Sequence, residues 1–247
     1  NKKFDALGYV NVEFKNYNAL QLVYIGNEIY ISYANASDSN AVRHYTFVST
    51  NNSVNLVLKG ELKLKHLGYG LTNLATDGSY LYAHGNNTIE VIDLNTFKLK
   101  TEINLKGGAK IQDIAAFNTK IYIGTTKNSI QIIKNGELTD SITGNLAYQS
   151  FSVTNDKFFG IGKLADNTYK MVDLSQNSAN VLFSSASLSN TQGNVNFGYD
   201  AFRKRFLISN ADYNPANALF SILDNTGKSV KTIKGKAQIL NIVAFEK

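Results

Sequence analysis

The chain has 247 residues, with 25 lysines and arginines against 19 acidic residues and a formal net charge of +6. This excess is too small for a nucleic-acid-binding arm and favours solubility or an acidic partner. The absence of cysteine excludes disulfides, thiolate metal sites and a cysteine nucleophile. No apolar run reaches the roughly 18 residues that a membrane-spanning helix requires.

Short runs of β-forming residues follow one another along the chain, with turn residues about every eight to twelve positions. One predicted strand, 9–14, precedes a series of similar repeats. The predicted strands of the first repeat are 20–24, 29–33, 42–48 and 54–58. The second repeat opens at Leu71 and has strands 80–82, 89–92 and 99–105. The third opens at Ile111, runs through 111–124 and 129–133 and closes at Ile142. The fourth begins near Tyr148, runs through 150–162 and has strands 169–172 and 181–183, and the fifth begins near Val195, runs through 195–209 and has strands 219–223 and 230–233. Asn135-Gly136 is the strongest hairpin signal. A last predicted strand, 237–245, resembles the opening strand of a repeat.

The opening strands define the architecture. They start near residues 19, 71, 111, 147, 194 and 237, so the spacing ranges from 36 residues (111 to 147) to 52 (19 to 71). Four strands at such a spacing are typical of β-propeller blades. Small residues in the opening strands, such as Ala75 and Ala115, suit a crowded inner position. We therefore predict an all-β fold, a single β-propeller domain over 1–247 with four-stranded antiparallel blades. Five full repeats and the terminal strands 9–14 and 237–245 give five or six blades.

The second repeat carries a recognisable set of residues. A turn at Asp77-Gly78-Ser79 precedes a strand with Tyr80 and Tyr82, and Asn87-Thr88-Ile89 leads into Val91-Ile92-Asp93. This order resembles the YVTN family of surface-layer and YncE-type propeller repeats, and the other repeats keep parts of it. The pairing Gly-His with Trp-Asp of standard WD40 arrays is absent, so the chain is only WD40-like. The resemblance implies a propeller in an exported or surface location, often without catalysis.

The histidines and the recurring aspartates are the first candidates for metal sites. His44, His66 and His84 are scattered, the first and last in or beside strands and His66 in a loop, and no H-x-H or H-E-x-x-H spacing is present. We expect structural or surface roles for them. Asp93, Asp173 and Asp224 recur after the third strand of a repeat, where a ring of calcium-binding carboxylates is one interpretation. The interpretation that we favour is a turn in which each aspartate accepts hydrogen bonds from the following backbone.

No nucleophile motif is present, since G-x-S-x-G is missing and the serine-rich stretch 184–189 has the composition of a loop. We expect neither a cofactor nor a metal, and the motifs favour a non-catalytic protein. Two alternatives stay open. One is a propeller enzyme, lactonase- or glycosidase-like, with its site at the channel mouth. The other is an accessory propeller of a periplasmic respiratory enzyme.

The blade assignment places charges on two faces of the propeller. Turns on one face carry Asp77, Asp93, Asp156, Asp173, Asp200 and Asp224, and loops on the other carry lysines. Two longer loops, 59–70 and 210–216, are expected on the basic face, where loops on a rigid scaffold tend to carry binding residues. The candidate binding residues are Lys59, Lys63, Lys65, His66, Tyr69, Lys106, Lys110, Lys163, Asp212, Tyr213 and Lys234. An even distribution of surface lysines would be the simpler explanation.

These observations lead to one functional prediction. We expect a monomeric binding or interaction module that presents a basic face of lysine and tyrosine to a protein partner or an anionic ligand, with no nucleic-acid partner. The chain begins with Asn1 and not with methionine. We expect a periplasmic, extracellular or surface protein from which a signal sequence has been removed.

Overall fold

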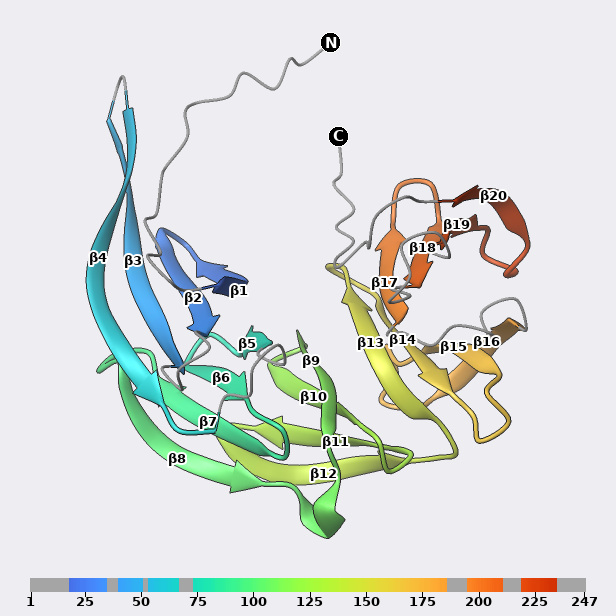
Figure 1. Ribbon diagram of the computed structural model, residues 1–247, viewed down its shortest axis with the longest axis horizontal. Coiled ribbons are helices and arrows are strands. Elements are labelled where there is room, and N and C mark those ends of the chain that lie inside the picture. Colours follow the sequence, from blue (N-terminus) through green and yellow to red (C-terminus); the bar gives the residue numbers. More distant parts are fainter. Residues whose placement is uncertain are drawn as a thin grey trace. The chain divides into compact units, whose positions relative to one another are not determined.

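The computed structural model describes residues 18–34, 40–50, 53–66, 73–185, 195–210 and 219–234. This part of the chain forms five four-stranded antiparallel sheets, and in each sheet the strands pair in the order in which they follow along the chain (Figure 1). Such meander sheets are the blades of a β-propeller, as the repeats predict. The predicted strands 9–14 and 237–245 lie outside the described residues. The chain divides into two compact units, Asn1–Leu105 and Lys106–Lys247.

The first unit holds two blades. Blade 1 consists of β1 (Asn18–Ile25), β2 (Glu28–Ala34), β3 (Asn40–Thr50) and β4 (Ser53–Leu64). Blade 2 consists of β5 (Leu74–Thr76), β6 (Tyr80–His84), β7 (Thr88–Asp93) and β8 (Lys98–Asn104). Between the blades lies an apolar core made by Tyr30, Val42, Leu64, Leu74, Leu81, Ala83 and Ile92.

The second unit begins with the short 3-10 helix η1 (Lys106–Gly108) and holds three blades. Blade 3 consists of β9 (Ile111–Phe117), β10 (Lys120–Thr125), β11 (Ser129–Lys134) and β12 (Glu137–Thr143). Blade 4 consists of β13 (Ala147–Val153), β14 (Phe158–Lys163), β15 (Tyr169–Asp173) and β16 (Asn180–Ser185). Blade 5 consists of β17 (Val195–Asp200), β18 (Arg205–Asn210), β19 (Leu219–Leu223) and β20 (Ser229–Lys234).

A phenylalanine stands at the centre of each blade interface in the second unit. Phe158, between blades 3 and 4, has its ring centroid 4.7 Å from that of Tyr122 and 5.4 Å from that of Phe117. Phe206, between blades 4 and 5, has its ring centroid 5.2 Å from that of Phe159. Aromatic pairs at such separations add to the free energy of burial, so these rings help to hold neighbouring blades together.

Polar side chains also link the first strands of neighbouring blades. Gln21 of β1 accepts a hydrogen bond from the backbone N–H of Leu74 at 2.6 Å. Asp113 of β9 accepts one from the N–H of Phe151 in β13 at 2.7 Å. The register of β1, β9 and β13 against the second strand shifts by one residue near these positions, so each first strand carries a bulge there.

Turn chemistry at the strand connections agrees with the sequence. Asn135 and Gly136 both have positive φ, 54° and 83°, and they connect β11 to β12 as a two-residue hairpin.

The prediction of a loop over 59–70 is wrong in its first half, because β4 continues to Leu64. In 61–64 polar and apolar residues alternate, and Leu62 and Leu64 turn toward the core while Glu61 and Lys63 stay exposed. That period of two extends the strand opposite the long β3.

Candidate binding surface

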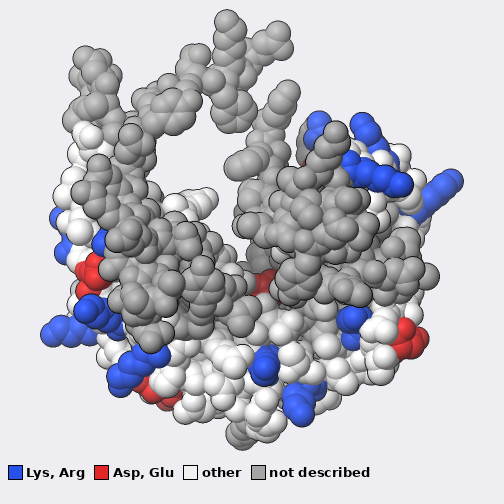
Figure 2. All heavy atoms as spheres, in the orientation of Figure 1, with Lys and Arg blue, Asp and Glu red and all other residues white. Residues whose placement is uncertain are grey.

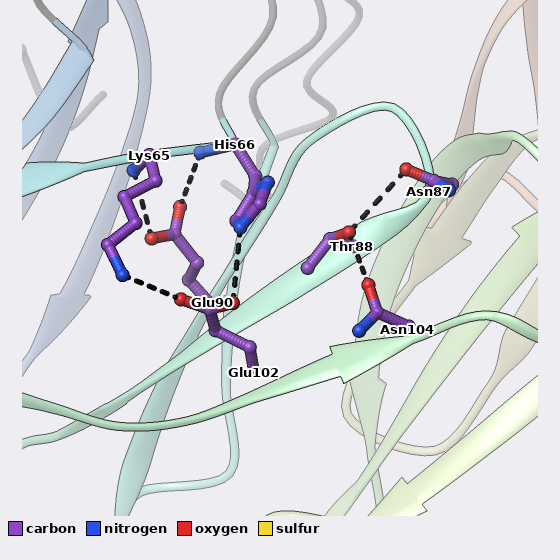
Figure 3. A network of polar contacts seen from close by, with 7 residues as sticks. All are labelled: Lys65, His66, Asn87, Thr88, Glu90, Glu102 and Asn104. Atoms are coloured by element: carbon purple, nitrogen blue, oxygen red, sulfur yellow. Dashed lines mark hydrogen bonds and ion pairs between the residues drawn. The ribbon is translucent and has the colours of Figure 1, made fainter.

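The end of β4 is held in place by a buried carboxylate from blade 2. Glu90 lies in β7 with 1% of its surface exposed. Its carboxylate accepts hydrogen bonds from the backbone N–H groups of Lys65, at 3.0 Å, and His66, at 3.2 Å (Figure 3). A buried carboxylate is tolerated only when its lone pairs find donors, and here the donors come from the chain that leaves β4. Lys65 and His66 therefore have a defined backbone position.

The side chains of the same two residues meet a second carboxylate, from β8. Glu102 accepts hydrogen bonds from Lys65 Nζ at 3.4 Å and from His66 Nε2 at 3.1 Å (Figure 3). Partial burial acts to raise the pKa of Glu102, but the hydrogen bond from His66 and the positive charge of Lys65 outweigh it and hold this pKa below its usual value. Lys65 keeps 74% of its side chain exposed, so it is available to a further partner.

Gly85 is required where the chain beyond β4 crosses the connection between β6 and β7. A Cβ atom at this position would lie 1.8 Å from the carbonyl oxygen of His66, far inside van der Waals contact. The connection itself is held by the N–H of Gly85, which donates to the carbonyl of Thr88 at 2.8 Å. The Thr88 hydroxyl in turn donates to Asn104 at 2.8 Å (Figure 3). Blade 2 thus contacts the chain at Lys65 and His66 through a hydrogen-bonded connection.

Further lysines precede this point along β4. Lys59 and Lys63 are exposed in the strand, and Glu61 between them is paired with Arg43 of β3 at 3.0 Å. A hydrogen bond from Tyr33, together with Arg43, lowers the pKa of Glu61 against the effect of partial burial. We call Lys59, Lys63, Lys65 and His66 the cationic edge. With Arg43 and the three carboxylates Glu61, Glu90 and Glu102, these residues and their contacts hold four cationic and three anionic groups, a net charge of +1 with neutral His66.

The other two histidines are part of the blades. His44 of β3 contacts Glu28, and its ring stacks on that of Tyr30 with centroids 4.6 Å apart. His84 of β6 is 1% exposed. Its Nδ1 lies 2.9 Å from the carbonyl oxygen of Gly85, which can only accept, so Nδ1 carries the proton of the neutral ring. Its Nε2 is buried without a hydrogen-bond partner among the residues that the structure describes, and burial lowers the pKa of His84 to about 4.

The recurring aspartates form turns, as the favoured interpretation predicts. Asp93 Oδ1 accepts hydrogen bonds from the N–H groups of Asn95 and Thr96, both at 2.9 Å. Asp173 Oδ1 accepts one from Ser175 at 2.8 Å, and Asp224 Oδ1 accepts them from Thr226 at 2.9 Å and Lys228 at 3.0 Å. Within the described ranges, no three histidine or acidic side chains converge as a metal-binding group.

The remaining candidates that the structure describes, Lys106, Lys110, Lys163 and Lys234, belong to the second unit. Lys110 is exposed ahead of β9, Lys234 is exposed at the end of β20, and Lys163 is half-buried in β14 with its Nζ 5.7 Å from the centroid of the Tyr169 ring. Lys106 lies in η1, and only its backbone is described. Tyr69, Asp212 and Tyr213 lie outside the described residues.

The separation of charge between two faces stays a prediction. The turns of the predicted acidic face all lie at the expected connections, between the first and second or the third and fourth strands of a blade. They carry Asp77, Asp93, Asp156, Asp173, Asp200 and Asp224. Connections of the same two kinds also carry exposed Lys134, Lys157, Lys204 and Lys228. On the face that Figure 2 shows, basic and acidic side chains are intermixed.

Sequence reasoning missed Glu90 and Glu102. The alternation of 89–92 suggests that Glu90 faces solvent, but β7 is buried along nearly its whole length. The one available signal is the acidic residue itself, between Ile89 and Val91. A carboxylate buried in a strand with neighbours on both sides needs hydrogen-bond donors, and these must come from outside its own hairpin. Its partners are backbone groups, which no sequence motif reveals.

Comparison with known proteins supports the fold. No protein-family model matches the chain, and no curated protein sequence matches it significantly. Among solved structures it is similar to BamB from Moraxella catarrhalis, with a TM-score of 0.54 and 11% sequence identity over 91% of this chain. The chain spans 63% of the length of that BamB chain. The described residues contain no helix that is long and apolar enough to cross a membrane. Five four-stranded antiparallel sheets and the likeness to BamB, a β-propeller, show that the chain has a β-propeller fold.

Proposed function

We propose that the chain is a non-catalytic binding module that uses its cationic edge to dock an acidic protein partner. The observation that carries this proposal is the pair of hydrogen bonds from Lys65 and His66 to the buried Glu90. They hold the backbone in place while the lysine side chain remains mostly exposed. Binding costs less when the contact residues are already ordered, so this arrangement favours recognition.

The charge of the cationic edge indicates the kind of partner. Lys59 and Lys63 lie in β4 and Lys65 directly follows it, and one of the nearby carboxylates, Glu61, is already paired with Arg43. A row of like charges raises the association rate of a partner with the opposite charge and suppresses partners of the same charge. An acidic protein surface is therefore the expected ligand, and a small anion would use the same groups.

The wider setting is part of the same proposal. We infer a single propeller domain over 1–247, monomeric and exported, in keeping with the resemblance of the second repeat to YVTN repeats. The likeness to BamB supports the fold on which the proposal depends.

Affinity capture from an extract of the source cells tests the proposal. The immobilised protein is compared with the double variant Lys59→Glu/Lys63→Glu and with the matched control Lys228→Glu/Lys231→Glu, which makes the same change of charge on exposed positions of blade 5. We expect a partner that the wild type and the control retain and the first variant loses. Equal retention by all three proteins would refute a role for the cationic edge.

A further inference from the structure

We infer that β4 is a docking edge to which an extended acidic segment of the partner adds as a fifth strand of blade 1. This inference rests on the proposed function and specifies how the partner binds. In strand addition, main-chain hydrogen bonds to an open sheet edge supply affinity and side chains on alternate positions supply specificity.

The length of β4 sets it apart from the last strands of the other blades. β4 has 12 residues, whereas β8 and β12 have 7 and β16 and β20 have 6. It is the last strand of its sheet and pairs with β3 alone among the described strands. Natural edge strands are usually short, carry lysines or contain a bulge, because an open edge invites pairing with another chain. β4 has lysines and a bulge at Lys59, but it is not short. A long one offers a template for a partner strand.

Part of this edge extends beyond the rest of the blade. β2 pairs with β3 only as far as Thr46, with one further hydrogen bond from the N–H of Phe47 to the carbonyl of Asn27 at 2.7 Å. β3 and β4 continue to pair through Phe47–Leu56, Val48–Asn55, Ser49–Val54 and Thr50–Ser53. This two-stranded extension is visible beyond β1 and β2 in Figure 1. Two strands alone are marginally stable in water, so a third strand would stabilise the extension.

Exposed apolar side chains lie on both faces of β4 directly after the extension. Val57 is 45% exposed and Leu58 is 52% exposed. Because they are consecutive in a strand, they point to opposite faces of the sheet. An added strand would therefore gain apolar contacts on either side, in a segment directly followed by Lys59.

The charges select an acidic segment over a second copy of this chain. The cationic edge carries a net charge of +1 with its paired groups, and two copies of β4 paired antiparallel about Glu61 would bring Lys59 of one against Lys63 of the other. Like charges on opposed strands destabilise the pair, and opposite charges stabilise it. The occupant that fits is an extended segment in which acidic residues alternate with β-branched ones.

A synthetic probe tests the docking mode. A fluorescent ten-residue peptide of alternating glutamate and valine is titrated against the wild-type protein, Lys59→Glu/Lys63→Glu and the control Lys228→Glu/Lys231→Glu. Amide hydrogen exchange is recorded with and without peptide. We expect saturable binding, at least about tenfold weaker in the first variant and unchanged in the control. Amides of β4 that face away from β3 should become protected.

The other outcomes separate the two proposals. Saturable, charge-dependent binding without new protection in β4 would overturn strand addition and leave recognition by the cationic edge intact. Failure of the peptide to bind would also overturn strand addition. It would not decide the proposed function, which the affinity capture with Lys59→Glu/Lys63→Glu tests independently. Self-association of the wild type through β4, seen by sedimentation and abolished by added charge there, would identify a second copy as the occupant and overturn the inference.

Discussion

Acidification between pH 7.5 and 5 is expected to destabilise the protein through His84. The neutral ring is buried in β6 and donates through Nδ1 to the carbonyl of Gly85, while Nε2 has no partner within the described part of the chain. A proton on Nε2 would place a charge in the apolar interior, and burial therefore lowers the pKa of His84 to about 4 from an ordinary value of 6.5. The unfolded chain takes up this proton more readily than the folded one, so protonation favours unfolding.

The size of the effect follows from the two pKa values. The contribution of His84 to stability is complete above pH 6.5 and decreases as the pH falls through that value toward 4. At pH 5 the expected loss is about 2 kcal/mol, and well below pH 4 it reaches about 3 kcal/mol. Carboxylates such as Glu28 and Glu61, whose pKa values lie below the ordinary 4.5, lose their contributions only at lower pH. The interval from pH 7.5 to 5 therefore reports mainly on histidine.

Urea unfolding at pH 7.5, 6 and 5 measures the free energy of unfolding directly. His84→Met removes the titrating group with an adaptable apolar side chain. The control His66→Gln removes an exposed histidine at the neighbouring cationic edge. We expect the wild type and the control to lose about 2 kcal/mol between pH 7.5 and 5 and His84→Met to lose much less. An equal loss in the wild type and His84→Met would refute the assignment of the buried, neutral state to His84.

Three further tests use urea unfolding, two on the supports of the cationic edge with a control substitution each, and one on a contact between blades 3 and 4. Glu90→Ala leaves the backbone N–H groups of Lys65 and His66 without their acceptor and is expected to lower the free energy of unfolding by about 3 kcal/mol. Its control, Glu102→Gln, changes a more exposed ion pair and should change stability little. Equal effects of the two substitutions would contradict a stabilising role for the hydrogen bonds to Glu90. Gly85→Ala forces a backbone carbonyl to move and should cost about 3 kcal/mol or prevent folding, while Gly144→Ala, with no atom near the added methyl group, should be nearly neutral. Asp113→Ala removes the link between the first strands of blades 3 and 4 and should cost about 2 kcal/mol; an unchanged midpoint would show that this link is dispensable.

The fold was accessible from the sequence because its signals are local. Hairpin turns such as Asn135-Gly136, and aspartates such as Asp93 that accept hydrogen bonds from the next residues, depend on a few neighbours in the chain. The repeat spacing then specifies four-stranded sheets. The sequence is misleading at the end of β4. The lysines of 59–65 favour a loop, but the alternation of polar and apolar residues at 61–64 continues the strand.

The site was accessible only in part, for a physical reason. Lys65 and His66 could be singled out as charged residues at the end of a repeat. Their acceptors, Glu90 and Glu102, lie 24 to 37 residues further along the chain, and they meet only because blade 2 packs against blade 1. Long-range contacts between side chains and backbone leave no pattern within one strand. The same holds for His84, whose burial depends on the packing of neighbouring strands.

The salt dependence of partner association tests the central claim most directly. With the partner obtained by capture, the association rate constant is measured at 20 and 300 mM salt for the wild type and for Lys59→Glu/Lys63→Glu. Docking through the cationic edge predicts a rate that falls about tenfold or more in the wild type as salt screens the charges, and a slow, nearly salt-independent rate in the variant. An association rate of the wild type that does not change with salt would contradict recognition of an acidic partner by this edge.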